Sequence, residues 1–110
     1  MMQKQLLIAD KELTEDFEMT RLVDVPEAQI NVVRLKAGKE LPAHNANSNV
    51  RLLVMDGGIT VTAEGDECGL ATHEMVSVAH GSFMQIRNVS DGDAAFLVIK
   101  VPNPVMLSSG

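Results

Sequence analysis

The sequence predicts an all-β fold, an antiparallel β-sandwich or barrel. Short apolar or alternating runs recur along the chain, each closed by Gly, Asn, Asp or Pro. Runs of this kind at about 8–12-residue spacing are typical of sandwiches and barrels. No long stretch keeps the period of an amphipathic helix. Because 110 residues suit one domain and leave little room for two, we expect a single all-β domain over residues 1–110.

Four runs in the first part of the chain are predicted to be strands. They are residues 4–9 (KQLLIA), 18–25 (EMTRLVDV), 29–35 (QINVVRL) and 39–44 (KELPAH). Residues 12–17 are expected to form one helical turn and little more. The predicted strands within residues 4–25 are expected to pack on the barrel or to swap into a dimer.

Six further runs are predicted to be strands: residues 50–55, 59–63, 67–71, 75–78, 82–88 and 94–101. Asp56-Gly57-Gly58 is predicted to be a hairpin turn, since glycine supplies the positive φ that such turns need. Residues 63–66 (AEGD) are predicted to form a second hairpin turn, and residues 88–93 the last turn. Pro102 and Pro104 end strand pairing, so the tail over residues 102–110 is expected to run free or to cover a neighbour.

Composition and charge exclude several classes of partner. Fifteen Asp and Glu against nine Lys and Arg give a formal net charge of −6, and there is no Trp or Tyr. Without a phosphate-binding patch or a base-stacking platform, nucleic acid is not an expected partner. No apolar run approaches the roughly 20 residues that span a bilayer, so no membrane partner is expected. A single Cys cannot form an internal disulfide, which agrees with a cytoplasmic location.

Several predicted strands are apolar on both faces. Residues 50–55 (VRLLVM) contain Arg51 as their one polar side chain, and residues 94–101 (AAFLVIKV) are nearly continuous. A strand with one solvated face alternates, so something is expected to cover the outer face of the sheet. The cover is either the chain's own N-terminal strands or a second copy. Because an exposed apolar sheet is a liability, we favour the second copy and expect a homodimer.

Two short motifs lie between residues 35 and 88. Gly38 and His44 are separated by five residues in the segment GKELPAH, and Gly57 follows in LVMDGGI. Residues 79–81 (AHG) and Asn88 form the second motif. On these residues the chain resembles a small single-domain cupin of the RmlC-like superfamily, cupin 2 type, with its barrel motifs over about residues 35–101. The resemblance implies a double-stranded β-helix fold.

The metal site of that family takes two His and a Glu from the first motif and a His from the second. At these positions the sequence has His44, Ala46, Val50 and Met84. With the alternative spacing Arg51 takes the Glu position, and a cation there would oppose a metal. A divalent ion needs several N or O donors at about 2 Å. The departures therefore indicate a degenerate site with no metal and no cofactor.

Strand alternation groups a set of lumen residues if His44 points inward. The inward positions are then Ala46, Val50, Leu52 and Val54, with Met84 and Ile86 opposite them. This lumen is either filled as core or forms a small apolar pocket with one polar group, which is the general form of a ligand site. The candidate ligand-binding residues are His44, Ala46, Val50, Leu52 and Met84.

The leading hypothesis is a metal-free cupin that acts as a homodimeric small-molecule-binding or regulatory module, with a small apolar ligand in the barrel. The alternative is an enzyme in which His44, with or without His80, is the general base on a small carbonyl or carbohydrate-like substrate. A third hypothesis is a structural domain with a filled lumen. His80 is otherwise interpreted as a solvated turn residue, and Cys68, beside acidic neighbours, as an inert thiol. The remaining candidates are interpreted as surface or turn residues: His73, Glu64, Asp66, Glu67 and Glu74.

Overall fold

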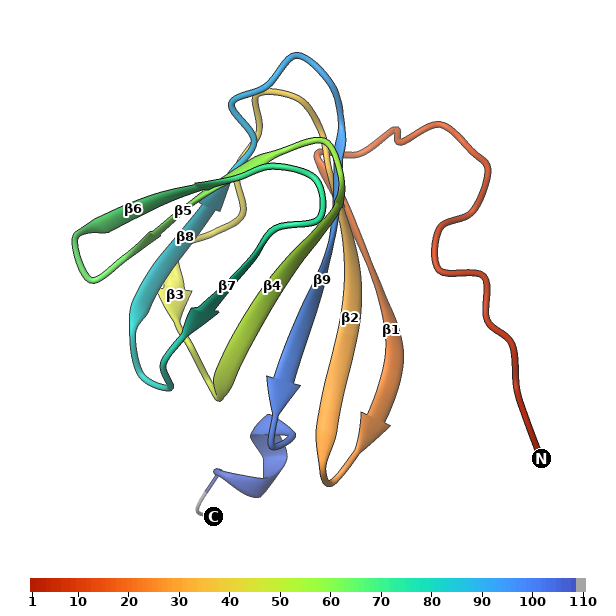
Figure 1. Ribbon diagram of the computed structural model, residues 1–110, viewed down its shortest axis with the longest axis vertical. Helices are drawn as coiled ribbons and strands as arrows, with labels where there is room; N and C mark the ends of the chain where they lie inside the picture. Colours follow the sequence, from red (N-terminus) through yellow and green to blue (C-terminus); the bar gives the residue numbers. More distant parts are fainter. Residues whose placement is uncertain (109–110) are drawn as a thin grey trace.

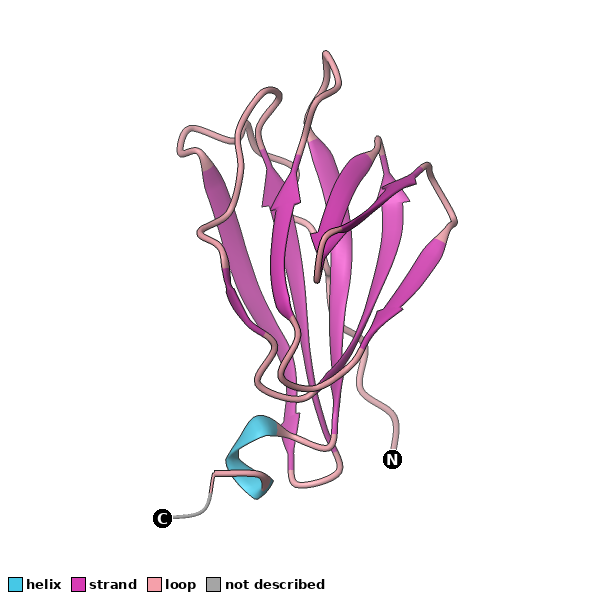
Figure 2. Ribbon diagram, turned by 90° about the vertical axis from the view of Figure 1, so that its left-hand side faces the viewer, coloured by secondary structure: helices cyan, strands magenta, loops and turns pink. Residues whose placement is uncertain are grey.

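Two antiparallel sheets face each other in the computed structural model, which describes residues 1–108 (Figure 1). The larger sheet has five strands, in the order β1 (Phe17–Val25), β2 (Ala28–Leu35), β9 (Ala94–Val101), β4 (Asn49–Asp56) and β7 (Met75–Val78). The smaller has four, in the order β3 (His44–Asn45), β8 (Phe83–Arg87), β5 (Ile59–Ala63) and β6 (Asp66–Leu70). A 3₁₀ helix, η1 (Pro104–Met106), follows β9 at the lower end of the molecule (Figure 2). The predicted antiparallel sandwich is confirmed.

Most strands form where the alternation of the sequence places them. β5, β7 and β9 begin and end at the predicted residues, and β1, β2, β4, β6 and β8 lie within one residue of prediction at each end. The strand predicted over residues 39–44 is wrong. Its place is taken by a bridge between Glu40 and Arg87 and by the two-residue β3, because Pro42 cannot donate to a ladder.

The predictions for the N-terminal segment are also wrong. Residues 4–9 form no strand, and residues 12–17 contain no helical turn before β1 begins. A strand needs a backbone ladder, whereas the bond from this segment to β1 comes from a side chain, Gln5 Nε2 donating to the Leu22 carbonyl (3.3 Å). A single helical turn orders several residues for one hydrogen bond, so it does not persist alone.

The N-terminal segment nevertheless covers part of the outer face of the larger sheet. Val32 and Arg34 point outward from β2, since Val33 between them belongs to the core. Arg34 Nη2 donates to the Lys11 carbonyl (2.9 Å). Leu13 and Val32, both outside the main core cluster, are each only 3% exposed. Of the two alternative covers, the chain's own N-terminal segment is therefore the one that this structure contains, over part of the sheet.

The core lies between the sheets, around the central strand β9. Phe96 on β9 and Leu52 and Val54 on β4 are fully buried. Burying each such side chain contributes about 1.5–3 kcal/mol. No helix in residues 1–108 is long and apolar enough to cross a membrane.

The connection after β4 differs from its prediction. Residues 56–58 do not close a hairpin, because β4 belongs to the larger sheet and β5 to the smaller. Gly57 has a φ of +78°, and a Cβ there would lie 2.8 Å from the Asp93 carbonyl oxygen. Glycine is therefore required by the close passage of the loop before β9. The predicted hairpin between β5 and β6 is confirmed, with φ of +51° at Glu64 and +85° at Gly65.

A buried asparagine ties that loop to the larger sheet. Asn88 is 1% exposed, and its Nδ2 donates to the carbonyls of Leu35 (3.0 Å) and Gly92 (2.8 Å). Its Oδ1 accepts from the backbone N (2.9 Å) and the hydroxyl (2.6 Å) of Ser90. An unpaired amide at this depth would be costly. The hydrogen bonds therefore order the crossing from the smaller sheet back to the larger one.

The start of the C-terminal tail is anchored to its own chain. Asn103 is 3% exposed, its Nδ2 donates to Asp24 Oδ1 (2.6 Å), and its Oδ1 accepts from the backbone N of Val105 (3.1 Å). The buried Ser48 hydroxyl donates to the Pro102 carbonyl (2.6 Å). The tail thus does not run free at its start, and residues 109–110 of the predicted tail lie outside the described residues.

Candidate functional site

A cavity of about 130 Å³ lies in the lumen between the two sheets. The larger sheet contributes Val33, Val50 and Val98, and β8 contributes Met84 and Ile86. All five are buried, so most of the wall is apolar. A mostly apolar cavity with a few placed polar groups is the general form of a ligand site. The polar residues around this cavity are Asn31, His44, Asn47 and Lys100.

Four of the five candidate ligand-binding residues lie around this cavity. They are His44, Ala46, Val50 and Met84. Ala46, Val50 and Met84 are buried, as the alternation predicts. Leu52, the fifth, is fully buried in the core and does not line the cavity. It occupies the next inward position along β4.

His44 lines the cavity with an exposed side chain, on β3 opposite Met84. Its Nδ1 is 3.1 Å from the Pro42 carbonyl oxygen. A carbonyl can only accept, so Nδ1 carries a hydrogen and Nε2 is free to accept a hydrogen bond in the neutral ring. No carboxylate among the described residues hydrogen-bonds to this imidazole.

Loop hydrogen bonds hold β3 against the turn before β8. Asn45 Nδ2 donates to the Gly81 carbonyl (2.9 Å), and the backbone N of Gly81 donates to the Ala46 carbonyl (2.8 Å). The backbone N of Ala46 donates in turn to the Ser82 carbonyl (2.8 Å). The turn that matched the second sequence motif therefore positions His44 and Ala46 at the cavity.

Lys100 is a charged lining residue that the candidate set lacks. The run over residues 94–101 predicts a nearly continuous apolar strand, yet counting by two from Phe96 through Val98 places Lys100 on the inward face. That alternation is the sequence signal that locates it. Burial lowers the pKa of Lys100 below its usual value, and the charge of Arg21 lowers it further.

Asn31 faces the same cavity from β2, opposite Arg21 on β1. Its side chain is buried, and its Oδ1 accepts a hydrogen bond from Arg21 Nε (3.2 Å). Because Oδ1 receives this bond, Nδ2 remains as a donor, and it donates to no other described residue. Along β2 Asn31 alternates with the buried Val33 and Leu35, so the period-two count that locates Lys100 also locates Asn31.

The other histidines and the cysteine lie away from the cavity. His80 is exposed in its turn, where its backbone N donates to Asn49 Oδ1 (3.2 Å). His73 is exposed with a φ of +73°. Cys68 is exposed on β6, at the edge of the smaller sheet.

The carboxylates around the hairpin turns contact the smaller sheet. Glu64 Oε1 accepts from the backbone N of Phe83 (2.6 Å), and Glu67 Oε1 pairs with Arg87 Nη2 (2.6 Å). Asp66 is exposed. Glu64 and Glu67 therefore stabilise the hairpin turns against the smaller sheet. Among the described residues these acids form no metal-binding cluster.

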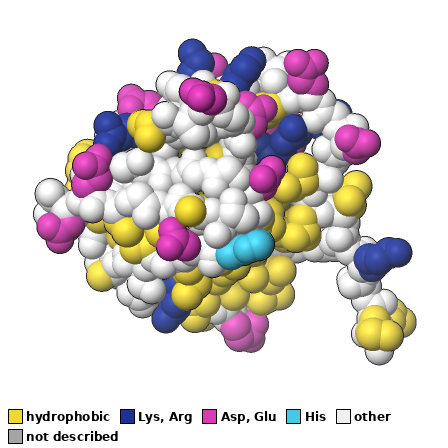
Figure 3. All heavy atoms as spheres, turned by 45° about the horizontal axis from the view of Figure 1, so that its top comes forward, with side chains coloured by type: hydrophobic (Ala, Val, Ile, Leu, Met, Phe, Trp, Pro, Cys, Tyr) yellow, Lys and Arg dark blue, Asp and Glu magenta, His cyan; other side chains and the backbone are white. Residues whose placement is uncertain are grey.

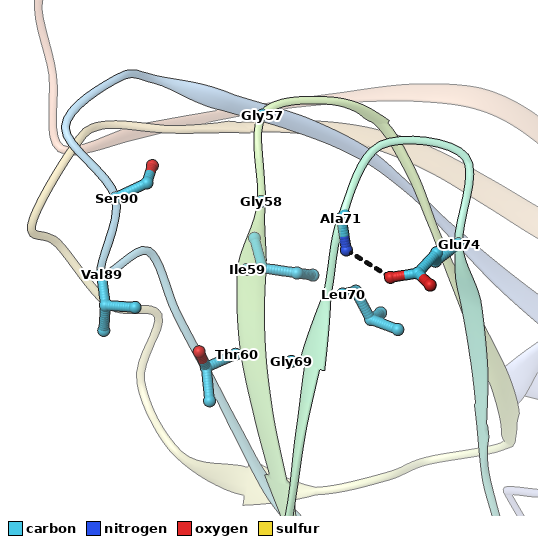
Figure 4. Close-up of a pocket in the computed structure, with 10 residues that line it drawn as sticks. All are labelled: Gly57, Gly58, Ile59, Thr60, Gly69, Leu70, Ala71, Glu74, Val89 and Ser90. Carbon is cyan, nitrogen blue, oxygen red and sulfur yellow. Dashed lines mark hydrogen bonds between the residues drawn. The ribbon is translucent and has the colours of Figure 1, made fainter.

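A second hollow, of about 370 Å³, lies over the Gly57-Gly58 turn and strands β5 and β6 (Figure 4). Its one charged lining residue is Glu74, whose Oε1 accepts from the backbone N of Ala71 (2.7 Å). The carboxylate is therefore already engaged in closing its own turn. With a broad opening to solvent, this hollow is a weaker candidate than the smaller lumen cavity.

The surface drawn in Figure 3 mixes acidic and basic side chains, with hydrophobic and histidine side chains between them. No field of one sign covers this face. A surface of this kind offers a polyanion no extended basic track.

Comparison with known proteins supplies the family. No protein-family model matches the sequence. The chain is 32% identical over 90 residues to the uncharacterised protein MJ0764 of Methanocaldococcus jannaschii. The aligned region covers 81% of this chain and 78% of that protein. The crystal structure of MJ0764, an RmlC-like cupin family protein with a double-stranded β-helix fold, matches with a TM-score of 0.79 and 27% identity over 91% of this chain and 94% of that one.

Two more distant structures share the fold. A cupin superfamily protein from Desulfitobacterium hafniense has a TM-score of 0.74 at 14% identity, over 83% of this chain and 82% of that one. The cupin domain of Schizosaccharomyces pombe Cnp3 has a TM-score of 0.75 at 18% identity, over 87% and 72%. Together with the facing sheets, these likenesses define a double-stranded β-helix protein. The chain belongs to the RmlC-like cupin family, as its identity to MJ0764 shows, and the resemblance seen in the sequence motifs is confirmed.

The residues around this lumen do not fit the metal that the family pattern implies. They offer one imidazole, from His44, two thioethers, from Met19 and Met84, the amides of Asn31 and Asn47, and no carboxylate. Within residues 1–108 no three His, Cys, Asp or Glu side chains gather closely enough to hold a metal ion. Lys100 also lines the cavity, and a divalent ion there would meet a like charge.

Proposed function

We propose that this chain is a metal-free cupin that binds a small, largely apolar molecule in its lumen. The observation that supports this is the cavity of about 130 Å³, whose wall contains Ala46, Val50 and Met84 at the positions of the family's metal ligands. Apolar side chains there favour apolar ligand surface, whose burial contributes about 25 cal/mol per Å². The protein then acts as a binding or regulatory module.

The cavity volume limits the size of the ligand. An apolar cavity of about 150 Å³ holds one benzene molecule. A cavity of about 130 Å³ therefore suits a ligand of roughly six non-hydrogen atoms. Sugars and nucleotides are larger and more polar than this wall accommodates.

Binding accounts for the site better than general-base catalysis does. A catalytic imidazole is held by a partner that also stabilises its protonated form, commonly a carboxylate. The partner of His44 is the neutral carbonyl of Pro42 (3.1 Å). His80 does not line the cavity, so the two imidazoles do not share a site.

Cavity filling tests lumen binding. Ala46→Leu adds volume inside the lumen, and Ala43→Leu, at an exposed position just before β3, is the matched control. The probes are a panel of neutral and charged compounds of about five to eight non-hydrogen atoms. Their binding is measured by thermal shift and by NMR. We expect some members to stabilise the wild type and Ala43→Leu but not Ala46→Leu. If no member binds, or if Ala46→Leu leaves binding unchanged, the lumen is structural and the proposal fails.

Elemental analysis tests the metal-free state. Protein purified without chelator is expected to contain no stoichiometric transition metal. A stoichiometric metal that disappears in His44→Ala would contradict the proposal.

We propose that the module works as a homodimer through the outer face of the larger sheet. On that face Leu53 lies opposite Leu97, and Arg51 lies opposite Ile99. The three aliphatic side chains are only partly buried in one copy. A second copy would remove them from water, which favours association.

Sedimentation equilibrium tests the dimer. Ile99→Lys is expected to shift the protein towards monomer. Thr62→Lys, on the smaller sheet, is expected to leave the equilibrium unchanged. A wild type that stays monomeric at every protein concentration measured would contradict the proposed dimer.

A further inference from the structure

The lumen contains a positive charge without a counter-ion. Lys100 lines the cavity and takes part in none of the ion pairs found within residues 1–108. The acid on the same cross-strand row is Asp24, which lies opposite Gln29, itself opposite Lys100. Asp24 Oδ1 accepts instead from Asn103 Nδ2 (2.6 Å). The cavity wall itself includes no Asp or Glu.

Two further donors lie on the same side of the lumen. Asn31, on the neighbouring strand, has its Nδ2 unengaged by other described residues, since its Oδ1 accepts from Arg21 Nε (3.2 Å). Arg21 adds a second positive charge near Lys100, close enough to depress the pKa of that lysine. The β1–β2–β9 side of the lumen therefore presents Asn31 and Lys100 beside the apolar Met19, Val33 and Val98, while the β8 side presents Met84 and Ile86.

We propose that the lumen ligand is a small monocarboxylate, with its carboxylate against Lys100 Nζ and Asn31 Nδ2 and its apolar end against Val50, Met84 and Ile86. This inference rests on the proposed function and names the class of ligand. Arg21 acts from behind Asn31, orienting the amide and adding long-range attraction for the anion.

The electrostatics favour an anion over a neutral ligand. A partly buried ammonium loses hydration, and no ion pair among the described residues compensates Lys100. A carboxylate restores a charged hydrogen-bond partner and matches the charge of Lys100 one for one. Burial and Arg21 both lower the pKa of Lys100, the direction expected for an uncompensated cation. A phosphate ester would bring a second charge and more oxygens into a largely apolar cavity of about 130 Å³.

The experiment compares butanoate with butanamide, two probes of the same shape that differ in charge. NMR titration near neutral pH suits the weak binding expected of such small molecules. We expect butanoate to bind at least tenfold more tightly than butanamide, with shifts at Val50 and Met84. Lys100→Met should abolish that preference, while Lys36→Met, at an exposed position, should preserve it. Arg21→Met is a second variant, at an exposed position on β1 outside the core, and it should reduce the preference for butanoate.

The outcomes separate this inference from the proposed function. Equal binding of the two probes, or a preference that survives Lys100→Met, overturns the carboxylate subsite while lumen binding stands. Binding of neither probe also overturns the subsite. The compound panel with Ala46→Leu decides independently whether the lumen binds any ligand.

Discussion

Replacing Asn88 by alanine is expected to destabilise the protein without touching the lumen. The side chain makes four hydrogen bonds, two donated to the Leu35 and Gly92 carbonyls and two accepted from Ser90. Its residue is 1% exposed, so water cannot replace all of these partners after truncation. The variant leaves the Leu35 carbonyl facing a small void.

The magnitude follows from the number of bonds and their burial. Each hydrogen bond contributes about 0.5–1.5 kcal/mol net, and a buried group left unpaired costs about 1–3 kcal/mol. Ser90 is exposed and regains water, so the loss is concentrated on the two carbonyls. We expect the free energy of unfolding to fall by roughly 2–4 kcal/mol, and Tm to fall by roughly 10–25 °C for a domain of this size.

Urea unfolding followed by circular dichroism measures this loss. Asn45→Ala is the control, because Asn45 is exposed and donates one hydrogen bond, to the Gly81 carbonyl; it should cost less than about 1 kcal/mol. Asn88→Asp keeps the acceptor but loses both donors and buries a charge, so it should cost at least as much as Asn88→Ala. If Asn88→Ala costs no more than Asn45→Ala, the reasoning about the buried loop is refuted.

Three other predictions use the same unfolding assay. Gly57→Ala should cost roughly 2 kcal/mol or more, because it combines a left-handed φ with a 2.8 Å approach to a carbonyl oxygen; Gly65→Ala, which has the φ but open space, should cost about 1 kcal/mol, and equal losses would contradict the steric argument. Lys100 has a lower pKa folded than unfolded, so its charge opposes folding below the folded pKa and this penalty fades as pH rises towards the unfolded value. Lys100→Met should therefore raise the free energy of unfolding by more at neutral pH than at pH about 10. A wild type that is more stable than the variant near pH 7 would contradict this prediction. Removing residues 1–13 should expose outer-face side chains of β2 and cost about 1–3 kcal/mol, and a truncated chain as stable as the full one would show that the segment covers nothing.

The strands could be predicted because their signal is local. Period-two alternation ended by turn residues locates β5, β7 and β9 at their observed bounds. Residues 4–9 have strand-like composition but no partner ladder, and composition cannot report the absence of a partner. For the same reason the Gly57-Gly58 turn looks like a hairpin in sequence, whereas the strands on either side of it enter different sheets.

Part of the site could also be predicted. The spacing of the cupin motifs and the alternation along β4 identify His44, Ala46, Val50 and Met84 as residues around the lumen. Leu52 satisfies the same alternation but lies beyond the cavity, since alternation specifies a face and not a depth. Asn31 and Lys100 satisfy a similar alternation along β2 and β9, but only the packing of the strands shows that both residues line one cavity.

By itself, the sequence determined the all-β class, the positions of most strands and the resemblance to the cupins. Each of these depends on residues within a few positions of one another. The tertiary structure alone decided that the lumen keeps a cavity of about 130 Å³ and that Lys100 and Asn31, from different strands, both line it. Cavity volume and the meeting of distant charges depend on how two sheets pack and on the long-range register between strands, and neither is encoded in any short stretch of the chain.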